Sequence, residues 1–473
     1  MGLISKIKGW LTMRLTSKVK EEFNVAPIST AEMDAFIQRC ENIYRGYPEW
    51  VDEEGHIKTV NFAKAICSET ARLATLGISV KVDGGARGEW LQEQIESMYF
   101  NLRHWVEYGC AYGTVVLKPN GRTVEAFTPG RFYVTEADNG EITGAVFQDY
   151  AYDSIEKKHY HRLEYHRFIG EGESRVYVVT NRCFVAQSAN DNGKPVSIEF
   201  TPWSDLAEEV MIQNVKQPLY GVFRTPQANN IDIDSAMGMP IFAEAIEELK
   251  DLDIAYSRNV KEILDSKRLT IIDSDRLMVS GQKVKNTAQG IAKAAQDIGL
   301  PDYIKALGSS SDNKEVYHEI NPELNTEMRL KGIDALLSQI GYKVGFANGH
   351  FVFDQSTGIQ TATGVEAEQQ RTIQFIKDVR DKLEDCVKGL IYALSVFADL
   401  YGYSPAGEYE VNCNFGDITY NEDEDRTRWY GYALQGKIPF WYYLQKFEGF
   451  TEEDAKALIA QAQTNTLPYE EEE

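Results

Sequence analysis

The chain has 473 residues, of which 43% are hydrophobic, so its length suggests two to four folded modules. Its 49 basic and 72 acidic residues give a net charge of −23, which argues against a protein that wraps nucleic acid by neutralising phosphates. The same charge is compatible with a protein through which DNA slides, because an acidic wall repels the duplex. No run of about 18 apolar residues is present, so the sequence predicts no membrane-spanning helix.

The first 23 residues are basic and amphipathic, with Lys6, Lys8 and Arg14 placed among apolar residues such as Trp10. The segment lacks the continuous apolar centre and the cleavage site of a signal peptide. We therefore expect a surface helix that docks on a neighbour, not a membrane anchor. The six cysteines are far apart and form no C-x-x-C pair, which is typical of a reduced, intracellular protein without a zinc knuckle.

The first half of the chain predicts helices followed by an antiparallel sheet. From Thr114 onwards the hydrophobic period changes to two, and the pairs Asn120-Gly121 and Asn139-Gly140 predict hairpin turns. Helices are expected over residues 29–46, 60–76 and 90–108, and strands over 78–82, 114–118, 124–127, 131–135, 142–150, 159–168 and 174–179. Residues 198–220 are expected to end this region irregularly.

The rest of the chain is organised around the segment from Gly238 to about Tyr401. It predicts a long helix, an irregular insert, a second long helix, a Gly-rich loop and a third long helix. In each helix apolar residues recur at spacings of three, four or seven, so they share one face. These residues are Phe242, Ile246, Leu249, Tyr256, Val260 and Ile263 in the first helix, Leu330, Ile333, Leu337, Ile340 and Val344 in the second, and Val365, Thr372, Ile376, Val379, Leu383, Cys386, Leu390 and Leu394 in the third.

Shorter elements are expected in the insert and after the third helix. The insert predicts strands at 269–272 and 317–320. The end of the chain predicts a strand, a helix that opens on an acidic run, a break and a final helix, over residues 409–415, 421–434, 436–439 and 452–463. The last four residues are all glutamate, and we expect them to be disordered.

Two patterns suggest enzymatic chemistry but do not meet its requirements. Residues 431–438 (GYALQGKI) nearly match a phosphate-binding loop, yet Ile438 offers no hydroxyl group to Mg²⁺. Asp251 and Asp253 are two residues apart on a helix and do not face each other, so a solvated helix face is expected instead of a two-metal nuclease site. The sequence therefore predicts no catalytic residue, no metal and no cofactor.

Three histidines lie close together in the predicted strand 159–168. His159 and His161 would share one face of the strand, whereas His166 would lie on the other. This alternation indicates a solvent-facing polar strand and not a metal site.

The loop after the second long helix, residues 345–359, combines two glycines, an Asn-Gly pair and three phenylalanines. One interpretation is a long connector packed by its own phenylalanines. The other is a mobile, projecting loop, because glycines absorb changes in backbone conformation. The residues alone do not decide between the two.

The chain resembles the portal proteins of tailed bacteriophages, specifically the branch that infects low-GC Gram-positive bacteria. The resemblance covers most of the chain, and it lies in the order of the elements and in several short stretches. These stretches are 61–71 (NFAKAICSETA), 111–119 (AYGTVVLKP), 238–246 (GMPIFAEAI), 253–257 (DIAYS), 361–363 (TAT) and 436–439 (GKIP). Their order and spacing carry the resemblance, since none of them is diagnostic alone.

The resemblance implies an α+β portal fold with a mixed wing, two stem helices around a clip, a long wing helix and a helical crown. Mapped onto this chain, the parts are an N-terminal amphipathic segment (1–23), the wing (24–237), stem helix 1 (238–267), the clip (268–321), stem helix 2 (322–344), a tunnel loop (345–360), the long wing helix (361–401), and the crown with its acidic tail (402–473). In such rings the apolar stripes bury between subunits.

The resemblance also implies a function without enzymatic activity. A dodecameric ring would sit at one capsid vertex of the virion after assembly in the host cytoplasm, and double-stranded DNA would enter and leave through it. Implied partners are the terminase large subunit, which carries the ATPase, the head-completion or adaptor proteins, and the capsid and scaffold proteins. No membrane is involved.

The resemblance assigns candidate roles to individual residues. Lys331 and the loop residues Asn348, Gly349, His350 and Phe351 would line the DNA channel. Three lysines of the clip would serve the partner interface: Lys283, Lys285 and Lys293. Two rival classes are a coiled-coil scaffold or adaptor, which predicts no closed ring, and an acidic nuclease, which predicts metal-dependent DNA cleavage.

Overall fold

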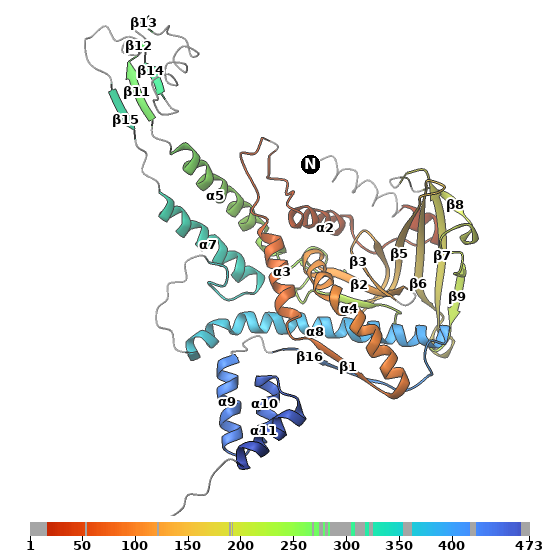
Figure 1. The fold of residues 1–473 in the computed structure, drawn as a ribbon. Coiled ribbons are helices and arrows are strands. Elements are labelled where there is room, and N and C mark those ends of the chain that lie inside the picture. Colours follow the sequence, from red (N-terminus) through yellow and green to blue (C-terminus); the bar gives the residue numbers. More distant parts are fainter. Residues whose placement is uncertain are drawn as a thin grey trace, which may run out of the picture. The chain divides into compact units, whose positions relative to one another are not determined.

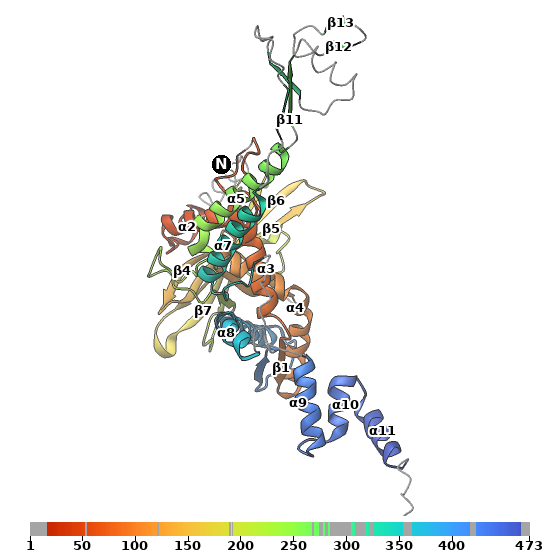
Figure 2. The same ribbon diagram turned by 90° about the vertical axis from the view of Figure 1, so that its left-hand side faces the viewer.

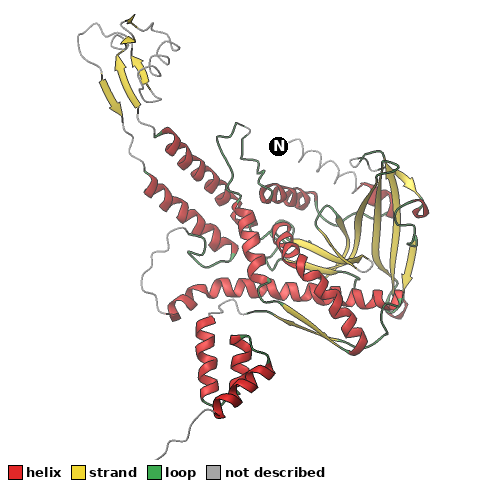
Figure 3. Cartoon of the chain, viewed as in Figure 1, coloured by secondary structure: helices red, strands yellow, loops and turns green. Residues whose placement is uncertain are grey.

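The computed structural model describes residues 17–52, 54–120, 123–188, 191, 193–266, 269–273, 278–279, 282–283, 304–307, 317–320, 325–352, 362–416 and 422–464. Helices and strands are mixed along these residues, which confirms the predicted α+β class (Figure 3). The chain divides into two compact units. The first comprises Met1–Thr75 and Val80–Cys413, and the second comprises Leu76–Ser79 and Asn414–Glu473.

The first unit begins with a helical segment over residues 17–23, which is followed by three longer helices that the sequence predicted. They are α2 (Ala31–Tyr44), α3 (Phe62–Ala74) and α4 (Gly85–Tyr112), with the strand β1 (Ser79–Asp83) before α4. Thr30 caps α2, because its hydroxyl accepts a hydrogen bond of 3.2 Å from the backbone N–H of Met33. Helix α4 ends at Gly113, whose φ of +79° favours glycine, and a Cβ there would lie 2.1 Å from the carbonyl oxygen of Gly238.

Two antiparallel sheets follow the helices (Figure 1). The six-stranded sheet has the order β4-β5-β6-β7-β8, with β9 paired to β7, and the three-stranded sheet has the order β10-β2-β3. Their strands are β2 (Thr114–Asn120), β3 (Thr123–Phe127), β4 (Phe132–Asp138), β5 (Glu141–Asp153), β6 (Lys158–Ile169), β7 (Val176–Ala186), β8 (Lys194–Val196), β9 (Glu209–Ile212) and β10 (Gly221–Arg224). Both predicted hairpins are present, β2–β3 and β4–β5. The expectation of irregular structure over 198–220 was wrong at β9.

The two long helices that flank the insert are α5 (Ile246–Asp265) and α7 (Thr326–Val344), and they pack side by side (Figures 1 and 2). A short 3-10 turn, η3 (Ala243–Ala245), precedes α5, so Phe242 lies before the helix and not on its stripe. Within the insert, β11 (Leu269–Asp273) pairs in parallel with β14 (Ile304–Leu307) and antiparallel with β15 (Tyr317–Ile320). A second, two-stranded pairing joins β12 (Met278–Val279) to β13 (Gln282–Lys283).

The third long helix, α8 (Ala362–Tyr401), packs against β10, β2, α3 and α4. Its predicted stripe is confirmed from Thr372 onwards, where Ile376, Val379, Cys386 and Leu390 are completely buried. Val365 has a side chain outside the described part. The stripe of α5 is only half confirmed, because Ile246 and Leu249 are buried, whereas Tyr256 and Ile263 are exposed. After α8, the strand β16 (Glu410–Asn414) pairs with β1.

The second unit is helical, with α9 (Glu422–Leu434), α10 (Phe440–Glu448) and α11 (Glu452–Thr464). Gly431 lies inside α9, so residues 431–438 do not form a phosphate-binding loop. Helix α10 was not predicted. Pro439 stands at its N-cap with an extended backbone, a position that suits proline, and Tyr443 packs on Tyr430 and Phe447.

Candidate functional site

The contact between α5 and α7 contains ion pairs near both ends of the helix pair. Toward the insert, Arg329 pairs with Glu262. Toward the wing, the Lys343 ammonium lies 2.6 Å from Glu248 and donates a hydrogen bond of 3.0 Å to the carbonyl oxygen of Glu244. These contacts fix how far the two helices can slide along each other.

A buried carboxylate attaches α5 to the loop between α2 and α3. The Asp253 side chain accepts hydrogen bonds of 2.8 Å from the Trp50 indole and from the backbone N–H of Val60. One turn further, the Ser257 hydroxyl accepts a hydrogen bond of 2.8 Å from the backbone N–H of Lys58. The expectation that Asp253 lies on a solvated face was wrong. Its spacing from Asp251 says nothing about a partner about 200 residues away in the chain.

The insert-side ends of α5 and α7 expose apolar side chains. Leu264 is 60% exposed and Met328 is 75% exposed, and Ile263 and Leu330 are also exposed. Among the described residues, no other element packs over these four side chains to bury them. We call these four residues the stem patch.

The start of the loop after α7 packs onto α3 and α8. Gly345 ends α7 with a φ of +118°, which glycine adopts readily, and Phe346 behind it is completely buried. The backbone N–H of Ala347 donates a hydrogen bond of 2.7 Å to the Thr372 hydroxyl of α8. For residues 345–352 the interpretation of a connector packed by its own phenylalanines fits. Residues 353–361 lie outside the described part.

Two of the candidate channel residues contribute to this packing. The Phe351 ring lies 5.2 Å from that of Phe62 in α3 and 4.8 Å from that of Phe346. The His350 ring also lies against Phe346, at 4.7 Å, and its Nε2 lies 3.6 Å from a Glu69 oxygen of α3. Asn348 is exposed, and Gly349 with φ +83° completes the turn beside it.

Glu69 is the electrostatic centre of this anchor. Its carboxylate lies 2.6 Å from the Arg72 guanidinium and also contacts His350. The hydrogen bond with Arg72, followed by that with His350, lowers the pKa of Glu69 to about 2. The carboxylate is therefore charged near neutral pH.

The structure does not bring all predicted channel residues together. Lys331 lies in the second turn of α7, about 21 Å along the helix from the loop at its end. Its ammonium is exposed and lies 2.8 Å from Glu327. Of the clip lysines, Lys283 belongs to β13, whereas Lys285 and Lys293 lie outside the described residues.

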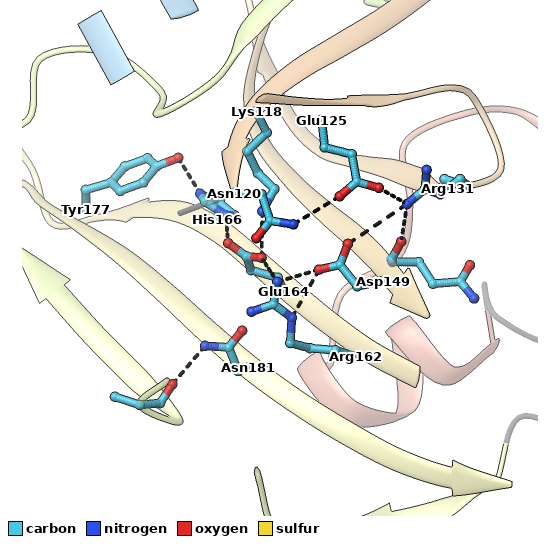
Figure 4. Close-up of polar contacts among 12 residues, drawn as sticks. Lys118, Asn120, Glu125, Arg131, Asp149, Arg162, Glu164, His166, Tyr177 and Asn181 are labelled. Atoms are coloured by element: carbon cyan, nitrogen blue, oxygen red, sulfur yellow. Dashed lines mark hydrogen bonds and ion pairs between the residues drawn. The ribbon is translucent and has the colours of Figure 1, made fainter. Parts of the chain in front are cut away.

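A buried network of charges lies under the six-stranded sheet (Figure 4). At its centre the Glu164 carboxylate lies 2.7 Å from the Lys118 ammonium of β2 and 2.8 Å from both Arg162 and His166. Arg162 also pairs with Asp149 of β5. The other ring nitrogen of His166 contacts the Tyr177 hydroxyl at 2.9 Å. All these side chains are buried.

The expectation of a solvent-facing histidine strand was therefore wrong. Both faces of β6 are covered, because Leu163 and Tyr165 pack with Val19 on one face and Glu164 lies among charged partners on the other. Burial raises the pKa of Glu164, but Lys118 and Arg162 outweigh it and hold that pKa well below the usual range. Every charged group in the network has a partner of opposite charge, which suits a structural role.

Sequence reasoning missed this network for a physical reason. Alternation along a strand separates its two faces but does not report whether a face is covered. Lys118 and Glu164 are 46 residues apart and belong to different sheets. Only a run of charged residues within an otherwise apolar sheet region could have suggested that they pair.

The described residues contain neither a candidate membrane span nor a candidate metal site. No helix there is both long and apolar enough to span a membrane. No group of three or more histidine, cysteine or acidic side chains is placed to hold a metal ion in that part of the chain.

No family model matches this chain, and no curated protein matches it.

Chains in three solved structures resemble it weakly. One is from the virion of a native gene transfer agent particle, with 11% identity, a TM-score of 0.37, and coverage of 92% of this chain and 95% of that chain. One is from the neck of the native particle computed with C12 symmetry, with 10% identity, a TM-score of 0.37, and coverage of 94% and 96%. The third is from the neck of the empty particle computed with C6 symmetry, with 10% identity, a TM-score of 0.38, and coverage of 92% and 95%. Likeness of this degree establishes neither a shared fold nor a shared function.

Proposed function

We propose that this chain is a portal protein, which forms a ring-shaped channel at one capsid vertex for packaging and ejecting DNA. The observation that carries the proposal is the order of its central elements. Two paired helices, α5 and α7, flank an insert with its own small sheet, and a loop then leads into the 40-residue helix α8. This is the order of stem, clip, stem, tunnel loop and wing helix that the sequence resemblance implies.

The stem patch supports the proposal. Leu264 and Met328 are large apolar side chains near the helix ends, and leaving them in water is unfavourable unless a partner covers them. In a closed ring the same patch recurs on every subunit, so a neighbouring copy can bury it by a heterologous contact. The expected number of subunits in the ring, near twelve, comes from the sequence resemblance alone.

The proposed channel residues take different roles in this account. Asn348 is exposed at the turn and is the described loop residue best placed to meet DNA. Phe351 and His350 anchor the start of the loop to α3, and we propose that they set where the rest of the loop begins. Lys331 would meet DNA further along the channel, near the insert.

Partners follow from the same assignment. The insert would face the terminase large subunit during packaging and the head-completion or adaptor proteins afterwards. Lys283, Lys285 and Lys293 would serve that interface. Capsid and scaffold proteins would surround the wing. The chain would carry no enzymatic activity, because the ATPase belongs to the terminase.

A coiled-coil scaffold is the weaker candidate. It would use the long stripe of α8 to join chains, but Val379 and Leu390 of that stripe are already completely buried within one chain. The stem patch spans only the last turn of α5 and the first turns of α7, which is shorter than the three to four heptads of a stable coiled coil.

Deleting residues 353–359 tests the channel role of the loop. We expect the variant to assemble rings like the unaltered protein, because Phe351 and the helices keep their contacts, while particles package or retain less DNA. Deleting residues 470–473, which removes four acidic residues from the chain end, is the control for an altered length. Normal packaging by the loop variant would contradict the role that we propose for the loop.

A further inference from the structure

A cavity of about 410 Å³ lies between α2 and the first strands of the six-stranded sheet. Its volume falls within the range of small-molecule sites, and it takes no part in the proposed channel. Helix α2 forms one wall, and β4, β5 and β6 form the other. The side chains that matter for its chemistry are Asp34, Glu41, Tyr133, Tyr150, His161 and Asp191.

His161 is the buried polar group that points to a ligand. Its side chain lines the cavity and is only 6% exposed, yet neither ring nitrogen makes a hydrogen bond within the described residues. The backbone of Asp191 lies close enough to His161 to favour the protonated form of the imidazole ring. It does not form a hydrogen bond with either ring nitrogen. His166, on the other face of the same strand, has both ring nitrogens bonded. Buried polar groups are normally satisfied, so a partner that enters the cavity would satisfy His161.

The charges around the cavity favour a cation. Asp34, Glu41 and Asp191 line it, and the single basic residue is Arg131. The Arg131 guanidinium lies 2.6 Å from Glu125, and Glu41 already pairs with Arg45 at 3.0 Å. Asp34 and Asp191 are therefore the carboxylates that favour a cation in the cavity. Burial lowers the pKa of His161, so its ring stays neutral near pH 7 and can accept a hydrogen bond.

The aromatic side chains add a second preference for positive charge. The Tyr150 ring lies 5.4 Å from the His161 ring, and Tyr133 lines the cavity beside them. Aromatic faces attract ammonium and guanidinium groups through their quadrupole. The walls also include apolar side chains such as Ile37 and Met237, which suit a methylene chain behind the charge.

We propose that this cavity binds an alkylammonium or guanidinium group, with His161 as a hydrogen-bond acceptor and Asp34 and Asp191 as counter-charges. The group could reach the cavity on a small free amine or on a basic side chain of a second copy of this chain. The N-terminal residues 1–16, which carry Lys6, Lys8 and Arg14, are the basic segment with the required chemistry. This inference does not depend on the portal proposal.

Calorimetric titration of the full-length protein at pH 7.5 tests the proposal and separates the two sources. Pentylamine probes the free amine, and 1-pentanol, which has the same chain without the charge, is its control. A peptide of residues 1–16 probes the second source, with a control peptide in which Lys6, Lys8 and Arg14 are glutamine. We expect the amine or the basic peptide to bind at least tenfold more tightly than its neutral control. Equal binding of charged and neutral probes, or binding of neither, would overturn the proposal.

Two variants locate the binding. His161→Leu removes the acceptor and Asp34→Asn removes one counter-charge, and each should weaken binding of the charged probe by at least fivefold. Glu32→Gln is the matched control, because Glu32 lies in the same first turn of α2 but does not line the cavity. His161→Leu should also leave the melting temperature unchanged or raise it, since it removes an unsatisfied buried group. Unweakened binding in both folded variants would mean that the cavity holds only ordered water at His161, and it would overturn the proposal.

Discussion

The helix α8 and the insert-side end of α5 follow the same sequence rule with opposite results. In α8, residues spaced by three and four, such as Val379 and Leu390, are completely buried within one chain. In α5, the same spacing leads to Ile263, which is half exposed, next to Leu264, which is more exposed still. Periodicity therefore identifies an apolar face of a helix. It does not show whether that face is buried by the same chain or by another chain. We propose that the stem patch is covered by a neighbouring copy.

The largest expected effect is in the buried network of the wing. Glu164→Gln removes the negative charge between Lys118 and Arg162, which leaves Lys118 buried without a counter-ion. Breaking a buried pair in this way typically costs about 3–5 kcal/mol. We expect a loss of that size in the free energy of unfolding, measured by urea denaturation.

The matched control for this change is on the surface of the same sheet. Glu156→Gln breaks an ion pair of similar length with Lys158, in which both side chains are exposed. Water already screens that pair, so we expect no measurable change. An equal loss in the two variants would show that burial is not the cause.

The second prediction compares two leucines directly. Leu383→Ala in α8 should lower the stability of the subunit by about 2–5 kcal/mol, because its side chain is 1% exposed and the change leaves a cavity. Leu264→Ala in the stem patch should leave the stability of the isolated subunit almost unchanged. It should instead shift the sedimentation profile from ring towards smaller species. A Leu264→Ala protein that assembles normally would remove the patch from the subunit interface.

A third prediction concerns the attachment of α5 to the wing. Asp253→Ala leaves the Trp50 indole and the Val60 N–H without their acceptor, which costs about 1–3 kcal/mol for each donor that stays buried. We expect a lower urea midpoint and a change in tryptophan fluorescence. Asp251→Ala, on the exposed side of the same helix, is the control and should have little effect.

The smallest expected effect is the pH dependence at the loop anchor. The folded-state pKa of Glu69 is about 2, below its ordinary value of 4.5, so the unfolded chain binds a proton there first as the pH falls. The stabilisation is complete above about pH 4.5 and is lost as the pH falls towards 2. Because Glu69 is partly exposed, we expect at most about 1 kcal/mol. Between pH 5 and pH 3, Glu69→Gln should therefore lose less stability than the unaltered protein.

The sequence predicted the elements whose signal is local. The hairpin at Asn139-Gly140, the cap at Thr30 and the stripe of α8 all depend on residues a few positions apart, and all are present. The buried role of Asp253 and the covering of His161 depend on partners far away in the chain. Local periodicity contains no information about such partners, so both were expected to be solvent-facing.

For the candidate site, the sequence likewise predicted the local feature but not the long-range contacts. The presence of a loop between α7 and α8 follows from Gly345 and its neighbours, and the structure agrees. The anchoring of His350 on Glu69 does not follow from any spacing, since about 280 residues separate them. The cavity at His161 was not foreseen, because the histidine strand was assigned to the surface.

The central claim is that this chain closes into a ring with a channel. Negative-stain electron microscopy of the purified protein, together with its mass in solution, tests that claim most directly. We expect a closed ring with a central hole and a mass near that of twelve subunits. An elongated dimer without a hole would contradict the portal proposal and would favour a scaffold protein instead.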